Sequence, residues 1–582
     1  MIAPTTPDHG TSLLFVEGGL TVILIALAMA LPRLGSGFFA WVERLFTGLA
    51  RRKGLAVAVV GISDLALRLA VLPIFPIPKP IVPDDFSFLL AADTFASGRL
   101  ANPTPAMWQH FESIHIDMQP TYMSMYFPGQ GLLLAASKVL FGHPWFGLLI
   151  VTALMCAAIC WMLQAWMPPT WALLGGFIAV LHLGIFSYWI NTYHAGSIVA
   201  FAGALVLGAL PRFIKKVRLR DSLLMALGIV LLIISRPYEG VLLCLPVGFV
   251  FVKWAFFSKQ RPAFGLLFRR TALPLALIAG AIAWMGYYDY KAFGNPLTPP
   301  YSINRNTYAI APYYVWQSQR PEPAYHHEVM RRFYNDNELP SFTKIHSVGG
   351  FIPETLFKCV RGFLFYAGFL LLPPMIMVRR VFLDRRIRFL IVVVLVMTAG
   401  LTIEIFLLPH YLAPFTAAFY AIGLQAMRHL RVWRPGDQPA GLSLVRLTIT
   451  FLILICGLRL AAEPLQMSVA HWPGSDWNMK WYGPGNYGES RAAIEARLEK
   501  LPGRQVVLVR YGAKHIPIDE WVYNSPDIEN SKVVWAHDMD PVKNKELMDY
   551  YKGSTVWLVQ PDLKPAGIEP YSLPFAGTQA AR

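Results

Sequence analysis

The chain has 582 residues, of which 55% are hydrophobic and only 15% are Asp, Glu, Lys or Arg. Soluble proteins are about 25% charged and 45–50% apolar, so this composition excludes a disordered chain, a secreted disulfide scaffold and a soluble enzyme of several domains. The mean hydropathy is +0.44, yet the formal net charge is +16, an excess typical of proteins that bind nucleic acid or an anionic surface.

Twelve apolar runs follow one another along the chain, several close to the roughly 20 residues that a membrane-spanning helix needs. They cover 12–31, 54–75, 145–166, 171–190, 197–210, 221–235, 239–256, 271–288, 361–377, 389–408, 411–426 and 447–463. The run 129–141 is too short to span a bilayer and predicts an interfacial or re-entrant helix. The predicted fold is therefore an α-helical polytopic membrane protein with about twelve transmembrane helices.

Basic residues gather in one alternating set of connections between these runs. The set comprises 32–53, 211–220, 257–270, 378–388 and 427–446, which together hold 23 Lys and Arg against three acidic residues. The short turns of the opposite set, 191–196, 236–238 and 409–411, contain a single basic residue, Arg236. Because loops rich in Lys and Arg stay in the cytoplasm, the charge excess predicts orientation in a membrane and no nucleic-acid partner.

Three long segments fall on the predicted outer side: 77–128, 289–360 and 464–582. We expect three parts: an extra helix and basic loop (1–53), a membrane domain with two outer loops (54–463), and a C-terminal part (464–582). The first helix lacks the basic region of a cleavable signal peptide, so we expect it to be retained.

The C-terminal part changes in composition, with 13 Lys and Arg against 14 Asp and Glu. Its pattern predicts helices at 490–501 and 541–551 and strands at 505–510, 531–535 and 555–559, which together indicate a small α/β domain outside the membrane. The Gly-rich stretch 483–488 has no strand before it, so we interpret it as a hinge and not as a phosphate-binding loop.

Two adjacent carboxylates, Asp84 and Asp85, open the first outer loop directly after the second apolar run. A carboxylate held near the membrane surface is a candidate general base, whose pKa burial and neighbouring groups can adjust. The apolar residues from Asp85 to Leu100 recur at helical spacing, so one aspartate could instead be the N-cap of a helix.

Polar residues also end apolar helices at the three short outer turns. These residues are His194 (with Asn191 and Tyr193), Arg236 (with Glu239), and His410 (with Tyr411). Polar groups near a bilayer are energetically expensive and tend to be functional, although a structural Arg236–Glu239 pair is the alternative for the second turn.

The order of these motifs resembles the GT-C glycosyltransferases, and within them the group of protein O-mannosyltransferases and aminoarabinose transferases. The resemblance covers most of 54–463. It rests on the acidic pair, the amphipathic helix, Tyr126-Phe127-Pro128-Gly129 before a short apolar helix, Arg236-Pro237-Tyr238-Glu239, and His410-Tyr411-Leu412-Ala413-Pro414. The first loop of that family usually reads Asp-Glu, whereas this chain has Asp84-Asp85.

The resemblance implies an enzyme of the bacterial inner membrane that takes a sugar from a polyprenyl-phosphate carrier. It passes the sugar to a lipid, glycan or protein acceptor on the outer face, with inversion in a single displacement. It implies that a carboxylate removes the acceptor proton, and we favour Asp85 as this base, with Asp84 steering or binding. The residues expected to bind substrate are Arg236, Glu239, His410, Tyr411, His194 and Tyr126.

No cofactor is expected. The adjacent His326 and His327 invite a metal interpretation, but neighbouring residues do not share a helix face and no third ligand has an obvious spacing. The five scattered cysteines, Cys156, Cys160, Cys244, Cys359 and Cys456, have neither zinc nor redox spacing.

Two other functions compete with the transferase. An O-antigen polymerase or ligase would lack the early acidic pair. A transporter or flippase predicts inverted repeats and ionisable residues at mid-membrane, whereas the candidates here lie at the outer ends, and Glu404 is the one acid it would emphasise.

Overall fold

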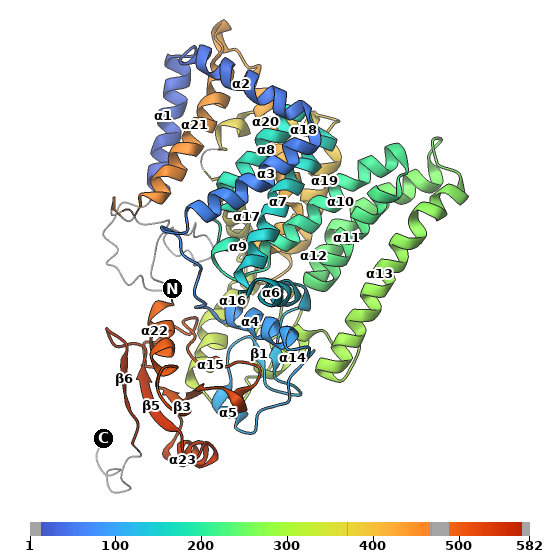
Figure 1. The fold of residues 1–582 in the computed structure, drawn as a ribbon. Coiled ribbons are helices and arrows are strands. Elements are labelled where there is room, and N and C mark those ends of the chain that lie inside the picture. The colour runs from blue at the N-terminus through green and yellow to red at the C-terminus, as the bar shows by residue number, and fades with distance from the viewer. Residues whose placement is uncertain (1–12, 369–370, 463, 466, 468–487, 573–582) are drawn as a thin grey trace.

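The computed structural model describes residues 13–368, 371–462, 464–465, 467 and 488–572 (Figure 1). The predicted Gly-rich hinge lies outside the described residues, apart from Gly488. In Figure 1 helices fill the upper part of the molecule, and the C-terminal sheet lies below them at the opposite end from α2.

Helices occupy every one of the twelve predicted apolar runs. The helices of ten or more residues in 13–462 are α1 Leu13–Ala30, α2 Ser36–Arg51, α3 Lys53–Ala70, α4 Pro83–Ala96, α6 Pro128–Phe141, α7 Trp145–Trp166, α8 Pro169–Ala179, α10 Gly196–Lys216, α11 Leu219–Ser235, α12 Pro237–Val252, α13 Phe264–Phe293, α17 Phe351–Ala367, α19 Arg388–Thr402, α20 Thr416–Arg431 and α21 Ala440–Leu460. Among the described residues, five helical segments are both long and apolar enough to cross a bilayer: Trp145–Trp166, Gly196–Lys216, Pro237–Phe257, Phe264–Phe293 and Ala440–Leu460. The chain is thus a multi-pass membrane protein, and the total of about twelve spans stays a prediction.

Short elements build the loops between these helices. They are α5 Trp108–Phe111, β1 Ile116–Asp117, β2 Met123–Ser124, α9 Tyr188–Asn191, α14 Pro300–Tyr308, α15 Glu328–Arg332, α16 Leu339–His346 and α18 Val378–Leu383, with β1 and β2 paired antiparallel. The run 171–190 is not one regular helix: α8 passes into a π-helical turn at Val180–Gly184 and then into α9. Single-turn π segments inside helices are frequent at functional sites.

The C-terminal residues form a four-stranded sheet with two helices. The elements are α22 Glu489–Leu498, β3 Gln505–Val509, β4 Val533–His537, α23 Pro541–Tyr550, β5 Thr555–Gln560 and β6 Gly567–Pro570. The strand order is β4-β3-β5-β6, in which β4, β3 and β5 are parallel and β6 is antiparallel. The sequence pattern indicates the three parallel strands, whereas the short edge strand β6 was not predicted.

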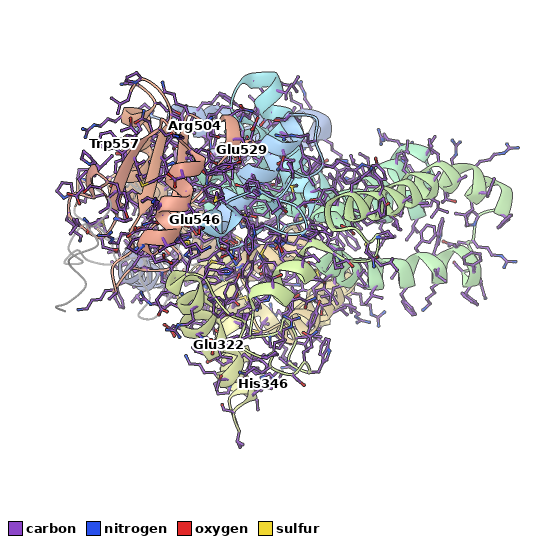
Figure 2. All side chains as sticks on the ribbon, turned by 90° about the horizontal axis from the view of Figure 1, so that it is seen from below. Glu322, His346, Arg504, Glu529, Glu546 and Trp557 are labelled. Carbon is purple, nitrogen blue, oxygen red and sulfur yellow. The ribbon has the colours of Figure 1, made fainter. Side chains whose placement is uncertain are left out.

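This sheet shares a hydrophobic core with loop 77–128. Phe111 and Tyr122 of the loop pack with Val506 and Leu508 of β3. The Tyr122 hydroxyl donates to the Asn524 carbonyl (2.8 Å), one of several hydrogen bonds between the two segments. Loop 289–360 lies at the same end, because its Tyr308 packs in one cluster with Tyr511 and Ile518 of the C-terminal part. Figure 2 views the molecule from this end, with Glu322 and His346 of the loop on one side and Arg504 and Trp557 on the other. Loops 77–128 and 289–360 and the sheet therefore form one assembly at that end of the helices.

Close packing of α10 against the turn that follows His410 gives the first prediction. A Cβ added to Gly203 would lie 1.9 Å from the backbone oxygen of Pro414, whereas one added to Gly423 in α20 meets nothing within 4 Å. We expect Gly203→Ala to lower protein stability by about 1–3 kcal/mol through overpacking. Gly423→Ala should be neutral or stabilising, because alanine is the better helix former. Thermal unfolding of the two variants in detergent measures the difference, and equal midpoints would contradict the packing.

Candidate active site

The acidic pair lies in the first turn of α4, where the sequence places the start of a helix. Val82 is the N-cap and Pro83 takes the first helical position, as proline often does, so neither aspartate is the N-cap. Asp84 and Asp85 occupy the next two positions. Both carboxylates lie where the unsatisfied N–H groups of the helix favour negative charge.

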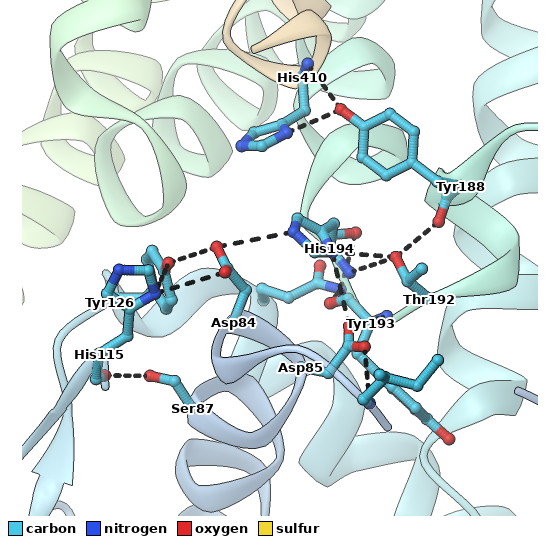
Figure 3. A network of polar contacts seen from close by, with 12 residues as sticks. Asp84, Asp85, Ser87, His115, Tyr126, Tyr188, Thr192, Tyr193, His194 and His410 are labelled. Atoms are coloured by element: carbon cyan, nitrogen blue, oxygen red, sulfur yellow. Dashed lines mark hydrogen bonds and ion pairs between the residues drawn. The ribbon is translucent and has the colours of Figure 1, made fainter. Parts of the chain in front are cut away.

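Asp84 lies at the centre of a cluster of polar side chains (Figure 3). Its Oδ1 accepts a hydrogen bond from the Tyr126 hydroxyl at 2.5 Å, and its Oδ2 is 3.3 Å from Nδ1 of His115. Nε2 of His194 is 3.6 Å from Oδ1 on another side. Burial alone would raise the pKa of Asp84, but the charges and hydrogen bonds of His115 and His194 lower it well below its usual range. Asp84 is therefore ionised at neutral pH.

Asp85 faces the turn between α9 and α10. Its Oδ1 accepts the backbone N–H of Tyr193 at 2.9 Å and lies 3.5 Å from Nδ1 of His194. Its Oδ2 accepts a long bond from the N–H of Ile81 (3.4 Å). The side chain of Asp85 is 2% exposed, whereas that of Asp84 is 15% exposed. Asp85 thus holds the backbone at Tyr193 and Ile81 in place, and Asp84 is the more accessible of the two side chains.

His194 bridges the two aspartates from the turn that follows α9. It is 1% exposed, and its Nδ1 is 2.9 Å from the Thr192 hydroxyl. Burial would lower the pKa of His194, but hydrogen bonds and charges from Asp84 and Asp85 raise it to about 9. At neutral pH His194 is therefore an imidazolium beside the ionised Asp84. Arg68 supports this turn from α3 by donating to the Asn191 side-chain carbonyl at 3.1 Å.

The turns that hold His410 and Arg236 continue the cluster. The His410 ring is 5.3 Å from the His194 ring, and Nδ1 of His410 is 2.7 Å from the Tyr188 hydroxyl. Burial and the charges of Arg236 and His194 lower the pKa of His410 well below its ordinary range, so this imidazole is neutral. The guanidinium carbon of Arg236 lies 4.3 Å from the ring centre of Tyr411.

Arg236 also forms the ion pair that the sequence left as an alternative. Its Nη1 donates to Oε1 of Glu239 at 3.1 Å, and both side chains are buried. The turn of Arg236 lies close to the start of α6, because a Cβ on Gly129 would come within 2.1 Å of the Ser235 hydroxyl. The glycine of the Tyr126–Gly129 motif therefore allows the close approach of α6 to the end of α11. Contacts run from Asp84 through His194, His410 and Tyr411 to Arg236.

Aromatic side chains from loop 289–360 cover one side of the cluster. The ring of Tyr301 is 5.5 Å from that of Tyr126, 5.4 Å from that of Phe127 and 5.6 Å from that of Tyr313. Arg305 of the same loop is buried and paired with Glu338 at 2.7 Å. The second outer loop thus contributes a wall of tyrosines.

Sequence reasoning missed several members of the cluster. His115 contacts both Asp84 and Tyr126, yet it is a lone histidine in an irregular loop, with a φ of +64° that no pattern indicates. Tyr188 and Thr192 lie beside a predicted turn. The partner of Tyr188 is His410, which is far away in the sequence, and Thr192 meets His194 only because the chain bends between them. The one available signal was their proximity to His194.

The histidine pair of the second loop makes protein contacts. Nδ1 of His326 is 2.7 Å from Oε2 of Glu112, and Nε2 of His327 is 2.6 Å from the Gln109 carbonyl. Among the described residues no group of three His, Cys, Asp or Glu side chains is arranged to hold a metal ion. The pair thus connects the two outer loops.

The raised pKa of His194 predicts a pH dependence of stability. Because the folded-state value of about 9 exceeds the ordinary 6.5, protonated His194 contributes stability that is complete below pH 6.5 and lost as the pH rises through 9. We expect the thermal midpoint of the wild type to fall more steeply between pH 7 and 9.5 than that of His194→Gln. Parallel curves for the two proteins would show that the imidazolium contributes nothing.

Comparison with known proteins gives no match in sequence and several in structure. No protein-family model matches the chain, and no curated protein is significantly similar to it in sequence. ArnT from Cupriavidus metallidurans bound to undecaprenyl phosphate is 14% identical, with a TM-score of 0.46 over 88% of this chain and 93% of that one. The structure of the same protein in its apo state is 13% identical, with a TM-score of 0.48 over 89% of this chain and 93% of that one.

The archaeal oligosaccharyltransferase AglB from Archaeoglobus fulgidus, in complex with an inhibitory peptide and a dolichol-phosphate, is 10% identical with a TM-score of 0.42. The match covers 77% of this chain and 62% of that one, so this chain spans less than two thirds of the oligosaccharyltransferase. At these identities and TM-scores the similarity assigns neither a family nor a substrate to this chain. The structure is thus similar to those of ArnT and AglB over 77–89% of this chain.

Proposed function

We propose that the protein is an inverting membrane glycosyltransferase that moves a sugar from a polyprenyl-phosphate carrier to an acceptor hydroxyl or amine. The observation that carries this proposal is the cluster around Asp84. An ionised carboxylate, two histidines and a buried guanidinium meet at the ends of apolar helices, where a lipid-linked phosphate would be presented. The order of the sequence motifs supports the same class of enzyme.

In the proposed reaction Asp84 is the general base. An acceptor O–H or N–H loses its proton to the Asp84 carboxylate while the acceptor atom forms a bond to the anomeric carbon. The bond between that carbon and the phosphate oxygen breaks, and polyprenyl phosphate leaves with the electron pair. We prefer Asp84 to Asp85, the choice favoured from sequence, because Asp85 is almost fully buried and bonded to backbone N–H groups.

Arg236 is the proposed partner of the leaving phosphate. A guanidinium is always charged and can donate two parallel hydrogen bonds to phosphate oxygens. Stabilising the charge that develops on a leaving group is usually the largest single contribution to catalysis. Glu239 and the Tyr411 ring hold Arg236 in position, and Tyr126 and the neutral His410 complete the walls of the substrate site.

The proposed location is the outer side of a bacterial inner membrane. The positive-inside pattern places Asp84, Arg236 and His410 on the face away from the cytoplasm. The C-terminal sheet packs on loop 77–128, which would place it on that same side. From there it could contact the acceptor.

Transfer in proteoliposomes tests the proposed function. The full-length protein is supplied with a polyprenyl-phosphate-linked sugar and a mixture of envelope lipids and glycans. We expect release of polyprenyl phosphate together with a glycosylated acceptor of inverted anomeric configuration. Transport of the intact donor across the bilayer without release of polyprenyl phosphate would contradict the proposal and favour a flippase.

A further inference from the structure

A cavity of about 590 Å³ opens far from Asp84, where four helices meet. It is lined by the start of α3, the ends of α7 and α10, and the connection into α11. The lining polar residues are Lys53, Gln164, Arg212, Lys215, Lys216, Arg218, Arg220 and Asp221. Since α10 begins two residues after His194 and has 21 residues, its length of about 30 Å separates this cavity from the candidate active site.

The charge of the cavity is strongly unbalanced. Six basic side chains line it against one acidic residue, Asp221, whose Oδ1 is 3.7 Å from Nε of Arg220. Within the described part of the chain, the side chains of Lys53, Lys215, Lys216 and Arg218 form no hydrogen bond or ion pair. Four uncompensated cations around one cavity repel one another and create a strongly positive potential, which an anion would neutralise.

The inner wall of the cavity is preformed. The Arg212 guanidinium donates to the carbonyls of Gly208 and Trp161, both at 2.6 Å, and stacks 4.0 Å from the Trp161 ring. Gln164 donates to the Lys53 carbonyl at 2.9 Å, which ties α7 to the start of α3. Val57 and Ala165 add apolar surface beside the charges. A phosphate that carries a hydrocarbon chain would contact the basic side chains with its phosphate and the apolar side chains with its hydrocarbon.

We infer that this cavity binds the phosphate headgroup of an anionic membrane lipid. Both α7 and α10 are long and apolar enough to span a bilayer. Their C-terminal ends, which line the cavity, therefore lie at the level of the lipid headgroups. Basic pockets between transmembrane helices on the cytoplasmic side are typical sites for such headgroups. The site is separate from the proposed donor site, and it holds a structural or regulatory lipid.

The test is lipid retention by the solubilised full-length protein. Phosphatidylglycerol is titrated in detergent and the lipid-bound fraction is read by native mass spectrometry. We expect the double variant Lys215→Gln/Arg218→Gln to bind at least 10-fold more weakly than the wild type. The matched control Lys259→Gln/Arg261→Gln removes the same two charges from another basic connection and should bind like the wild type. The charge-preserving variant Lys215→Arg/Arg218→Lys should retain binding.

Three results would overturn the inference. Equal weakening in the two Gln variants would mean diffuse attraction to the whole basic face. Equal retention of phosphatidylcholine would mean that the phosphate charge is not recognised. If 10 mM inorganic phosphate raised the unfolding midpoint as much as the lipid does, the ligand would be a free anion. Thermal unfolding midpoints of the three variants within 2 °C of the wild-type midpoint would show that all three are folded.

Discussion

Replacing Asp84 by Asn is expected to lower kcat for sugar transfer by about 10²- to 10⁴-fold, the usual contribution of a general base. The amide keeps the shape of the side chain but cannot take the acceptor proton. Binding of the polyprenyl-phosphate donor should change little, because the proposed phosphate contacts belong to Arg236. Single-turnover release of polyprenyl phosphate and separate donor binding by native mass spectrometry measure the two effects.

Asp85→Asn is the matched control for this prediction. Asp85 accepts the backbone N–H of Tyr193, so its loss should loosen the turn that carries His194 and lower the thermal midpoint. We expect the folded fraction to keep a kcat within about 10-fold of the wild type. An inactive Asp85→Asn protein with an unchanged midpoint, together with an active Asp84→Asn protein, would return the role of base to Asp85.

Replacing Arg236 by Gln is expected to lower kcat/KM by about 10²- to 10³-fold, the effect of removing one donor to a developing oxyanion. In the proposed reaction the buried guanidinium would supply the charge that a departing phosphate needs, and its ion pair with Glu239 holds it in place. Arg236→Lys keeps a charge without the planar fork, so we expect it to recover only part of the loss. Initial rates over a range of donor concentrations distinguish weaker binding from slower chemistry.

Arg331→Gln serves as the control for Arg236. Arg331 is an exposed arginine of the second outer loop, paired with Glu328 as Arg236 is with Glu239. Its loss should leave kcat/KM unchanged, because exposed ion pairs contribute little and it lies outside the cluster. If both variants lost activity equally, a general electrostatic effect of the outer surface would explain the result.

Much of the fold follows from local patterns. Helices occupy all twelve apolar runs, and strands β3, β4 and β5 lie where short runs of Val, Leu and Trp predict them. The sequence also singles out the turns that hold His194, Arg236 and His410, and the structure brings their side chains close together. The side of the membrane on which they lie stays a prediction. The weaker elements were less predictable: β6 is a short edge strand of low apolar content, and a π-helical turn at Val180–Gly184 interrupts the run 171–190.

The site required contacts between distant parts of the chain. Asp84 and Asp85 are neighbours on one helical turn, and nothing in their order distinguishes the accessible carboxylate from the buried one. Their roles separate because the turn carrying Tyr193 and His194 covers Asp85, while His115 and Tyr126 reach Asp84 from the first loop. The packing of the C-terminal sheet against loop 77–128 is likewise invisible to a local pattern.

The sequence by itself determined that long apolar helices dominate this chain and which residue types are available for chemistry. The sidedness that the Lys and Arg of the connections indicate stays a prediction. Hydropathy and charge act residue by residue, so they can be counted along the chain. Only the tertiary structure decided which aspartate is the more accessible, and which cations among the described residues remain without a partner at the far end of the helices. Burial and pairing depend on neighbours up to several hundred residues away, and those neighbours set both pKa values and accessibility.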